Sequence, residues 1–381
     1  MEKKEKTEYI VLTSKDHYNP LGIVRTLGEY GIRPIVVAVK SDPKQSVLSR
    51  YVEKKYYVSN AEEGIQLILS KYGGKREKNY ILTGDDVTVM YLDKHYDELK
   101  DSFYFFNAGK AGRIREVMEK DYMCCLAAKY GFNVPKTWKV RIGEIPNDIE
   151  FPVITKAINS FGAEWKSIVH ICKNVEELKE AYKRIKASDC LLLQEYIEKK
   201  DEQSYEGFSI NNGRDVFFAV QNNEVFHIPG QYAPYWKNKN VDDLEFKTQA
   251  QKLLYEIGFE GIFEFEFLVG VDGKMYFLEI NLRNTVNSWT ATVAGMPLAS
   301  LWCEAMKNKE IPNGIYKEIP DGFTTIAECF DYDARVKKGL IGRNEWIKQY
   351  RDANAKLYLG RKDFYPFFVF MFYKFIHKRV K

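Results

Sequence analysis

Residues 261–285 read GIFEFEFLVGVDGKMYFLEINLRNT, and they are the most informative segment of the chain. Residues 263–267 alternate strictly between Phe and Glu. Because successive side chains of a β-strand point to opposite faces, the three Phe side chains lie on one face and Glu264 and Glu266 on the other. Residues 275–281 form a second stretch with the character of a strand. The segment therefore predicts an antiparallel hairpin.

The turn of the hairpin determines which residues of its two strands face each other. Asp272-Gly273 is typical of a two-residue turn. With these two residues at the tip, Glu266 faces Glu279 and Glu264 faces Asn281. Two carboxylates placed directly opposite, with Cβ atoms ~5 Å apart, repel each other. A bound divalent cation would remove this repulsion.

The facing carboxylates predict a metal site. Hard cations such as Mg2+ take oxygen ligands, commonly one or two carboxylates together with substrate phosphates. Glu266, Glu279 and the side-chain carbonyl of Asn281 form such a set, and Arg283 on the same face has the planar fork that holds a phosphate. The alternative is a solvated charged face on an edge hairpin. The Phe, Leu and Ile residues around the carboxylates disfavour it, because they imply burial.

The hairpin closely resembles the metal-binding hairpin of the ATP-grasp enzymes, in which an acidic residue, a turn and an E-I-N-x-R segment grip Mg2+ and the ATP phosphates. The thirteen-residue spacing between Glu266 and Glu279 is similar to that of the D-alanine–D-alanine ligases. The resemblance implies that Glu266, Glu279 and Asn281 bind Mg2+ or Mn2+. It also implies that Arg283 contacts the transferred phosphate. Glu264 lies outside the usual pattern.

Further motifs of the same family follow in order along the chain. One lysine opens a helical pattern before residues 131–135 (GFNVP), and another ends a strand that begins FPV. A strand that ends in EYI resembles the hinge that meets the adenine. The phosphate loop, residues 157–166, departs from the family because it has one Gly and one Ser. The resemblance assigns these residues to ATP: Lys120, Lys156, Ser160, Glu195, Tyr196, Ile197 and Asp201.

The resemblance implies an ATP-dependent ligase that joins a carboxylate to an amine through an acyl phosphate. Arg283 and Lys156 would be the catalytic residues, and the acceptor would meet the segment after the hairpin. Residues 230–240 (GQYAPYWKNKN) read as an aromatic, basic lid. Residues 19–25 and 49–51 resemble segments of ligases near D-aspartate ligase. This implies an amino acid as one substrate and leaves a cell-wall or glycan precursor as a candidate for the other. The acceptor-side candidates are Ser288, Trp289 and Thr290.

Three other functions compete with the ligase. A non-catalytic ATP-binding protein of the same fold would not need the full set of lysines, acids and Arg283. A biotin-dependent-type carboxylase gives no reason for an aromatic lid. A glycosyltransferase with a parallel sheet leaves the facing pair Glu266 and Glu279 unexplained. The five histidines lie at no triad-like position, so the sequence offers no alternative nucleophile site.

Composition and charge exclude several further classes of protein. The chain has 381 residues, a net charge of only +4 and 45% apolar residues, which disfavours disorder and a nucleic-acid partner. The six cysteines have no metal-type spacing and are typical of a reduced, cytoplasmic protein. No stretch approaches the roughly 20 apolar residues of a membrane span. Oligomeric state is not readable.

The order of elements predicts a fold of mixed α/β and α+β class. Short apolar runs alternate with helical patterns over the first hundred residues, which predicts a small parallel sheet and places ligands at its carboxyl edge, near residues 14–22 and 84–86. A two-part ATP-grasp fold would follow. The predicted domains are 1–108 (N-terminal sheet), 109–190 (lysines and phosphate loop), 191–312 (hinge and metal hairpin) and 313–381 (C-terminal extension).

The last residues, 364–381, are rich in Phe and Tyr and end in a basic cluster. Pro366 suits the first turn of a helix. Such a helix either docks on the protein or lies at an anionic membrane surface, which would bring a cytoplasmic enzyme to the inner face of the membrane. Docking is the favoured interpretation.

Overall fold

The structure is a computed structural model, and it describes residues 6–379 except 16, 41–44, 159–164, 187, 227–232 and 361. The chain forms two compact units. Unit 1 comprises residues 1–114, 203–264 and 281–381, and unit 2 comprises residues 115–202 and 265–280. The chain therefore leaves unit 1 twice and returns to it twice.

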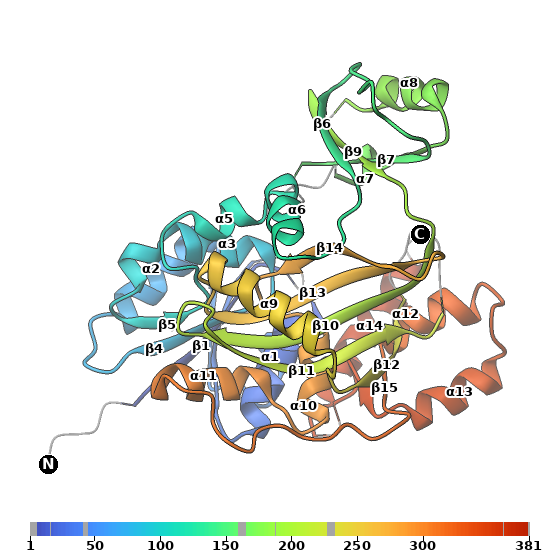
Figure 1. Cartoon of the computed structure of the whole chain (residues 1–381). Helices are drawn as coiled ribbons and strands as arrows, with labels where there is room; N and C mark the ends of the chain where they lie inside the picture. The colour runs from blue at the N-terminus through green and yellow to red at the C-terminus, as the bar shows by residue number, and fades with distance from the viewer. Residues whose placement is uncertain are drawn as a thin grey trace, which may run out of the picture. The chain divides into compact units, whose positions relative to one another are not determined.

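The N-terminal part of unit 1 contains the predicted parallel sheet (Figure 1). All four of its strand pairs are parallel. Ile10 and Leu12 of the central strand pack with Ile65 and Ile68 of the helix that follows the third strand. The strands, in sheet order, are β3 (Lys54–Val58), β2 (Ile35–Val39), β1 (Tyr9–Thr13), β4 (Asn79–Thr83) and β5 (Phe103–Phe105). The helices are α1 (Tyr18–Glu29), α2 (Ala61–Tyr72), α3 (Asp86–Lys94) and α4 (Tyr96–Leu99).

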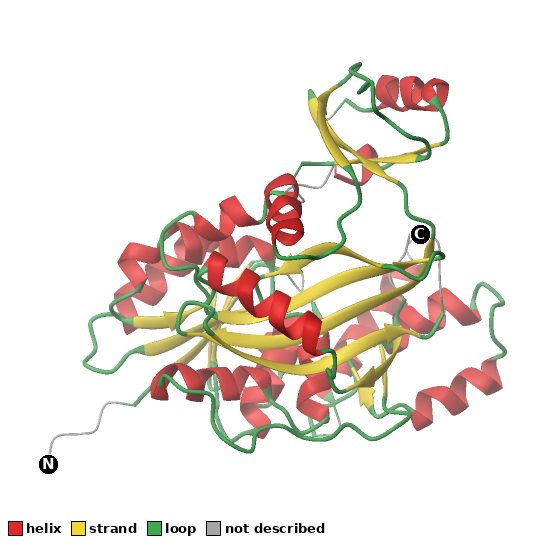
Figure 2. Ribbon diagram, in the orientation of Figure 1, coloured by secondary structure: helices red, strands yellow, loops and turns green. Residues whose placement is uncertain are grey.

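A seven-stranded sheet contains the hairpin that the sequence predicted (Figure 2). Asn211 and Asn212 have positive φ angles of 54° and 55° and make the turn between β10 and β11. The helix α9 (Leu244–Ile257) packs on this sheet, where Phe246 stacks on Tyr205 with ring centroids 3.9 Å apart. The strands, in sheet order, are β14 (Met275–Asn281), β13 (Gly261–Gly270), β10 (Lys199–Ile210), β11 (Asp215–Glu224), β12 (Tyr235–Lys239), β15 (Thr324–Ile326) and β16 (Ala355–Lys356).

The predicted aromatic lid is wrong for the residues that the structure describes. Residues 235–239 form β12, an internal strand paired with β11 on one side and β15 on the other. Tyr235 and Asn238 are buried there. The aromatic residues are therefore part of the sheet. Because β15 comes from the C-terminal extension and pairs with β12, it covers a strand that would otherwise be an exposed edge. Residues 230–232 lie outside the described residues.

Unit 2 is built on an antiparallel four-stranded sheet. Leu191 and Leu193 pack with Val153 and Leu178 in its core. The strands, in sheet order, are β6 (Thr137–Arg141), β9 (Cys190–Glu195), β7 (Val153–Lys156) and β8 (Ile171–Cys172). The helices are α5 (Arg113–Val117), which begins at the end of unit 1, α6 (Lys120–Lys129), α7 (Trp165–Ile168) and α8 (Val175–Arg184).

Two segments of this region are interrupted. Residues 113–129 form two helices, α5 and α6. In residues 167–172, α7 ends at Ile168 and only Ile171–Cys172 is strand. Between them the buried Thr155 hydroxyl bonds to the Ile168 carbonyl and accepts a bond from the His170 amide at 2.8 Å.

The remaining elements of unit 1 follow the hairpin. The helices are α10 (Asn287–Val293), α11 (Leu298–Asn308), α12 (Glu328–Asp331), α13 (Arg343–Asp352) and α14 (Tyr365–Arg379), and residues 332–336 form one π-helical turn. Within the described residues, no helix combines the length and apolarity needed to cross a membrane.

Candidate active site

Two lysines and a glutamate form a charged cluster in unit 2. Lys156 is the last residue of β7, and its Nζ donates to Oε1 of Gln194 at 2.6 Å. Burial and, to a smaller extent, the nearby charge of Lys120 lower the pKa of Lys156 to about 8, while Glu279 acts in the opposite direction. The structure thus brings together three residues that the sequence assigned to ATP and metal. A buried, poorly compensated ammonium is a group that a phosphate would stabilise.

The helix that carries Lys120 is fixed near the phosphate loop. Lys120 is the first residue of α6, and its amide donates to the carbonyl of Ile158 at 3.3 Å. The N-terminus of an α-helix favours anions, because its first amides lack partners within the helix and its dipole is positive there. Ser160, the predicted loop contact, lies outside the described residues.

The predicted adenine hinge follows β9. The Tyr196 amide donates to the Pro152 carbonyl at 3.0 Å, and the Glu195 amide donates to the Lys136 carbonyl at 2.8 Å. The Glu195 carboxylate is exposed and accepts a bond from the Lys136 amide, so any contact of this residue with adenine would use its backbone. Next, the Val271 amide at the hairpin tip donates to the Glu198 carbonyl at 3.0 Å.

Asp201, the predicted ribose contact, lies within β10 rather than in a loop. Its carboxylate accepts a bond from the Glu202 amide at 2.8 Å. Glu202, the next residue, pairs with Lys199 at 2.5 Å. Neither side chain projects from an open turn, so the ribose contact stays a prediction.

The turn of the hairpin differs from the prediction. The Gly270 amide donates to the Lys274 carbonyl, and the Gly273 amide donates to the Gly270 carbonyl, both at 2.9 Å. These bonds enclose three residues, so the predicted two-residue turn is wrong. Gly273 has a φ of +79°, as expected for a three-residue loop that closes with a bulge.

At the base of the hairpin, the predicted neighbours do meet. Nδ2 of Asn281 lies 3.3 Å from a carboxylate oxygen of Glu264. The other oxygen of Glu264 accepts a bond from Nδ2 of Asn287 at 2.8 Å. Glu264, the residue outside the family pattern, therefore orients the amide of Asn281, because an amide nitrogen turned toward Glu264 leaves its carbonyl oxygen directed elsewhere.

A second buried carboxylate lies beside Glu264 and was not predicted. Glu206 of β10 accepts bonds from the hydroxyls of Thr285 and Ser288. Burial raises the pKa of Glu206 well above its usual value, and the charge of Glu264 raises it further. These two acids hold the segment that follows β14 against the sheet. No pattern in the sequence marks Glu206, because it lies on a different strand about eighty residues away.

Arg283 points to the carboxyl edge of the parallel sheet. Its guanidinium makes a two-pronged contact with Asp86, with Nε 2.5 Å from Oδ1 and Nη2 3.4 Å from Oδ2. The neighbouring Asn284 amide donates to the Thr83 carbonyl at 3.3 Å. Residues 84–86, which the fold rule marked as a ligand position, thus meet the end of the metal hairpin.

His17 belongs to the same edge and was expected to be an ordinary histidine. Burial lowers its pKa to about 4, and the charge of Arg283 contributes in the same direction. Ser14 donates to Asp85 through both its amide, at 2.9 Å, and its hydroxyl, at 2.6 Å. A neutral imidazole, an arginine and two aspartates therefore surround the carboxyl ends of β1 and β4.

The three acceptor-side candidates all lie on α10 and are all buried. The Ser288 hydroxyl donates to Glu206 at 3.0 Å, and Nε1 of Trp289 donates to the Lys356 carbonyl at 3.0 Å. The Thr290 hydroxyl lies 2.9 Å from the hydroxyl of Thr325. Each side chain fastens α10 to another element of unit 1, and direct contact with an acceptor stays a prediction.

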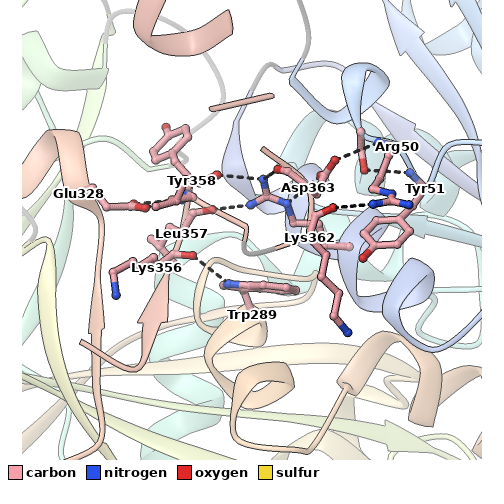
Figure 3. A network of polar contacts seen from close by, with 12 residues as sticks. Arg50, Tyr51, Trp289, Glu328, Lys356, Leu357, Tyr358, Lys362 and Asp363 are labelled. Carbon is pink, nitrogen blue, oxygen red and sulfur yellow. Dashed lines mark hydrogen bonds and ion pairs between the residues drawn. The ribbon is translucent and has the colours of Figure 1, made fainter. Parts of the chain in front are cut away.

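The segments that resembled an amino-acid site have structural partners. Arg25 is buried, and its Nε donates to Asp363 at 3.0 Å while its other nitrogens donate to backbone carbonyls of residues 357, 358 and 363. The Arg50 amide donates to Asp363 at 2.9 Å. Figure 3 shows Asp363 close to Arg50, and Glu328 pointing to the backbone at Tyr358. These arginines hold the C-terminal extension.

The donor set of the predicted metal site fits Mg2+. The predicted ligands Glu266 and Glu279 would supply carboxylates, and Asn281 would supply an amide carbonyl; hard cations prefer these oxygens. Within the described ranges, no group of three His, Cys, Asp or Glu side chains is arranged for a metal ion. The predicted set has two acids and one amide, so it depends on further oxygens from phosphate and water, as is usual for Mg2+ bound with a nucleotide.

Two cavities in unit 1, of about 480 and 550 Å3, contain none of the predicted site residues. The smaller is polar and includes Lys78, Tyr104 and Asn211. The larger lies in the C-terminal extension and includes Trp346, Tyr350 and Phe367. The ATP-site assignments therefore depend on the charged clusters rather than on these cavities.

Comparison with known proteins matches the region that contains most of the predicted site residues. Residues 129–312 match the model of the carbamoyl-phosphate synthase L chain, ATP binding domain. A 115-residue segment is 30% identical to N5-carboxyaminoimidazole ribonucleotide synthase of Staphylococcus aureus, over 30% of each chain. The chain spans less than a third of the length of the curated relatives it matches.

Two solved structures are similar over most of the chain. One is the biotin carboxylase domain of the Hydrogenobacter thermophilus 2-oxoglutarate carboxylase, solved with MgADP, ADP and bicarbonate, with a TM-score of 0.60 at 19% identity over 83% of this chain and 73% of that one. The other is an L-amino acid ligase from Bacillus licheniformis, with a TM-score of 0.57 at 12% identity over 80% and 74%.

Proposed function

Because the chain has the ATP-grasp fold, we propose that it is an ATP-dependent, ADP-forming ligase that joins a carboxylate to an amine. The observation that carries the proposal is the cluster of Lys156, Lys120 and Glu279 in unit 2. Two cations beside a metal-type carboxylate suit a magnesium-bound polyphosphate. A protein that only kept the fold would have no reason to bury a lysine and lower its pKa.

The reaction has two steps. A carboxylate oxygen attacks the γ-phosphorus of ATP, the bond from the γ-phosphorus to the bridging oxygen breaks, and ADP leaves. The amine then attacks the carbonyl carbon of the acyl phosphate, the bond from that carbon to the phosphate oxygen breaks, and the amine gives up one proton to solvent. The products are an amide, ADP and phosphate. Positioning and charge neutralisation supply the rate, and no nucleophilic side chain is needed.

The roles of the side chains follow from their charges. Lys120 and Lys156 neutralise the α- and β-phosphates, and the hinge at residues 195–197 meets the adenine. Arg283 stabilises the acyl phosphate and the tetrahedral adduct that forms from it. Its bidentate contact with Asp86 fixes the guanidinium plane before substrate arrives.

Glu266, Glu279 and Asn281 would hold Mg2+, or Mn2+ in its place. When bound, the ion would supply charge neutralisation for the phosphates of the nucleotide. Glu264 helps by fixing the amide of Asn281, since it accepts from the Nδ2 of that residue. Outer-shell partners of this kind orient ligands in metal sites.

For the substrates, we propose an amino acid as one partner and a cell-wall or glycan precursor as the other. The similarity to a structure named L-amino acid ligase supports the amino acid. A second candidate is bicarbonate as the carboxylate. It is favoured by the similarity to a carboxylase domain solved with bicarbonate and by the relative named N5-carboxyaminoimidazole ribonucleotide synthase. Both candidate reactions phosphorylate a carboxylate, and they differ in the molecule that supplies this carboxylate.

Phosphate release separates these candidates. The purified chain with Mg-ATP should release phosphate when supplied with the correct pair, in a screen of amino acids with amine or carboxylate partners and, in parallel, bicarbonate with the same amines. Release with bicarbonate and no response to any amino acid would select the carboxylase. Release that needs neither partner, or none with any pair despite ATP binding, would contradict the ligase.

Glu279→Gln tests the metal assignment. The substitution removes one negative charge and keeps the shape of the side chain, so turnover should fall by at least ~100-fold because one hard ligand is lost. Circular dichroism and the unfolding midpoint should stay unchanged. The matched control is Glu176→Gln, the same conservative change of an exposed acid on α8 of unit 2, outside the predicted site. Equal turnover in the two variants would exclude Glu279 as a ligand.

A further inference from the structure

The C-terminal helix α14 is docked by one of its faces. Phe367 and Phe370 pack on a cluster that includes Trp289 and Tyr358. Phe370 stacks on Tyr358, with ring centroids 4.4 Å apart and planes 11° from parallel. The Lys374 ammonium pairs with Asp333 at 2.7 Å. The docking predicted from the sequence is therefore confirmed for this face.

The opposite face of α14 is aromatic and exposed. Phe368 and Phe372 are 62% and 63% exposed, and Phe364, just before the helix, is 51% exposed. With a spacing of four residues, these three side chains line one side of the helix. Tyr365, 62% exposed, belongs to the same side. Five of the eighteen large apolar side chains that are exposed in the described part of the chain fall within residues 364–373.

The exposed aromatic face of α14 indicates an interaction with a partner. A helix that is apolar on all sides is normally buried, and a concentrated apolar patch on a protein surface marks an interaction site. Docking has covered the inner face of α14 and has left the outer one open. The helix begins two residues after Asp363, which Arg25 and the Arg50 amide hold in place. The exposed face is thus presented from a fixed position.

Charge indicates what the partner is. Residues 313–381 contain fourteen Lys and Arg against eight Asp and Glu, a net charge of +6, whereas the whole chain has +4. From residue 361 to the end, six basic residues accompany one acid, and that acid, Asp363, is buried. The rest of the chain is slightly acidic, so the positive charge is concentrated in the same part of the sequence as the aromatic residues.

We propose that the outer face of α14 binds the surface of an anionic lipid bilayer. The Phe and Tyr rings enter the headgroup boundary, and the basic residues that follow Lys374 in the sequence neutralise lipid phosphates; both are features of helices that lie in a membrane interface. A second copy of the chain would bury the rings equally well, but it would bring two sets of positive charge together. The inference does not depend on the proposed reaction.

The test is co-sedimentation of the full chain with vesicles of phosphatidylcholine, with and without phosphatidylglycerol. The chain should bind the anionic vesicles and be released by high salt, because exposed charges are screened. The variant Phe368→Gln/Phe372→Gln removes two exposed rings and keeps residues that suit a helix. We expect it to lower the affinity by at least ~10-fold, given the large apolar area lost.

The control is Leu244→Gln/Tyr255→Gln, which removes two exposed apolar side chains, 75% and 54% exposed, from α9. This variant should bind vesicles as the unchanged chain does. A third variant, Lys378→Gln/Arg379→Gln/Lys381→Gln, should bind anionic vesicles on the order of tenfold or more weakly, because each basic residue near the surface contributes to binding. Substitution is preferable to deleting residues 364–381, which would also uncover the docked face.

Three results would overturn the proposal. The unchanged chain fails to bind anionic vesicles; the α14 variant binds as strongly as the α9 control; or light scattering shows a dimer that only the α14 variant dissociates, without vesicle binding, which would assign the face to a second copy. Phosphate release from soluble substrates should be the same in the α14 variant and the unchanged chain. A loss of membrane binding is thereby distinguished from a failure of the ligase.

Discussion

Lys156 is the residue from which we expect the strongest pH dependence of Mg-ATP binding. Burial and Lys120 lower its pKa to about 8 in the absence of nucleotide, so above pH 8 the unbound protein holds this side chain mostly neutral. Phosphates bind the charged form, and nucleotide binding must then take up a proton. The affinity for Mg-ATP should therefore fall as pH rises, by roughly tenfold between pH 7 and pH 9.

Isothermal titration of Mg-ATP at several pH values measures this change, and proton uptake appears as a dependence of the heat on the buffer. Lys156→Arg is the control, because a guanidinium stays charged in this range and its affinity should vary little with pH, whatever its absolute value. The same slope in both proteins would show that another group titrates.

Candidate residues could be named from the sequence where their type and spacing carried the chemistry. Glu266, Glu279, Asn281 and the two lysines stand at spacings that a known family shares, so the sequence alone names them as candidates, and their binding of metal and phosphate stays a prediction. Glu206 could not be selected, because its role comes from a contact with Thr285, in a segment far along the chain.

At the scale of elements, the hairpin tip is the part most sensitive to a small change. Gly273 has a φ of +79°, and a Cβ added there would meet no atom within 4 Å. The cost of Gly273→Ala is therefore the backbone cost alone, about 1–2 kcal/mol. Because the Val271 amide at this tip bonds to the carbonyl of Glu198, just after the hinge, the substitution should also weaken ATP binding.

Denaturant unfolding and ATP titration measure the two effects. Gly342→Ala is the matched control, since its added Cβ is equally unobstructed while its φ of −69° suits any residue. It should change the free energy of unfolding by no more than ~0.5 kcal/mol. An equal loss of unfolding free energy in both variants would contradict the explanation by backbone conformation.

Elements were predicted well where a periodic pattern was undisturbed. The parallel sheet expected in the first hundred residues and the hairpin expected over residues 261–285 are both present. Prediction failed where a tertiary contact decides the conformation. Residues 235–239 look like a lid because they are aromatic and basic, yet they form an internal strand, since β15 arrives from almost ninety residues later to cover them.

For the whole molecule, the contact between Arg25 and Asp363 joins the first helix to the C-terminal extension. The side chains are 1% and 2% exposed, with Nε 3.0 Å from Oδ2. Asp363→Asn keeps the shape but leaves a buried guanidinium without its countercharge. Such a loss costs about 3–5 kcal/mol, so the free energy of unfolding should drop by that amount.

Chemical denaturation checks this value against Asp97→Asn, which breaks an exposed pair with Lys100 of 2.7 Å. Exposed pairs contribute ~0–1 kcal/mol, so the control should be nearly neutral. Similar effects of the two substitutions would mean that the extension is held by its apolar contacts alone. The sequence could not predict this pair, and the resemblance to amino-acid ligases suggested a different use for Arg25.

The same pair has a consequence for how the protein is made. Arg25 leaves the ribosome 338 residues before Asp363, and the strands β15 and β16 that finish the large sheet also come late in the chain. Contacts between distant residues form late and slow the folding of a chain. Unit 1 therefore cannot complete its fold early in synthesis. Both β12 and the docking site for α14 stay uncovered until β15, β16 and α14 have left the ribosome. The nascent chain should depend on chaperones until α14 is released.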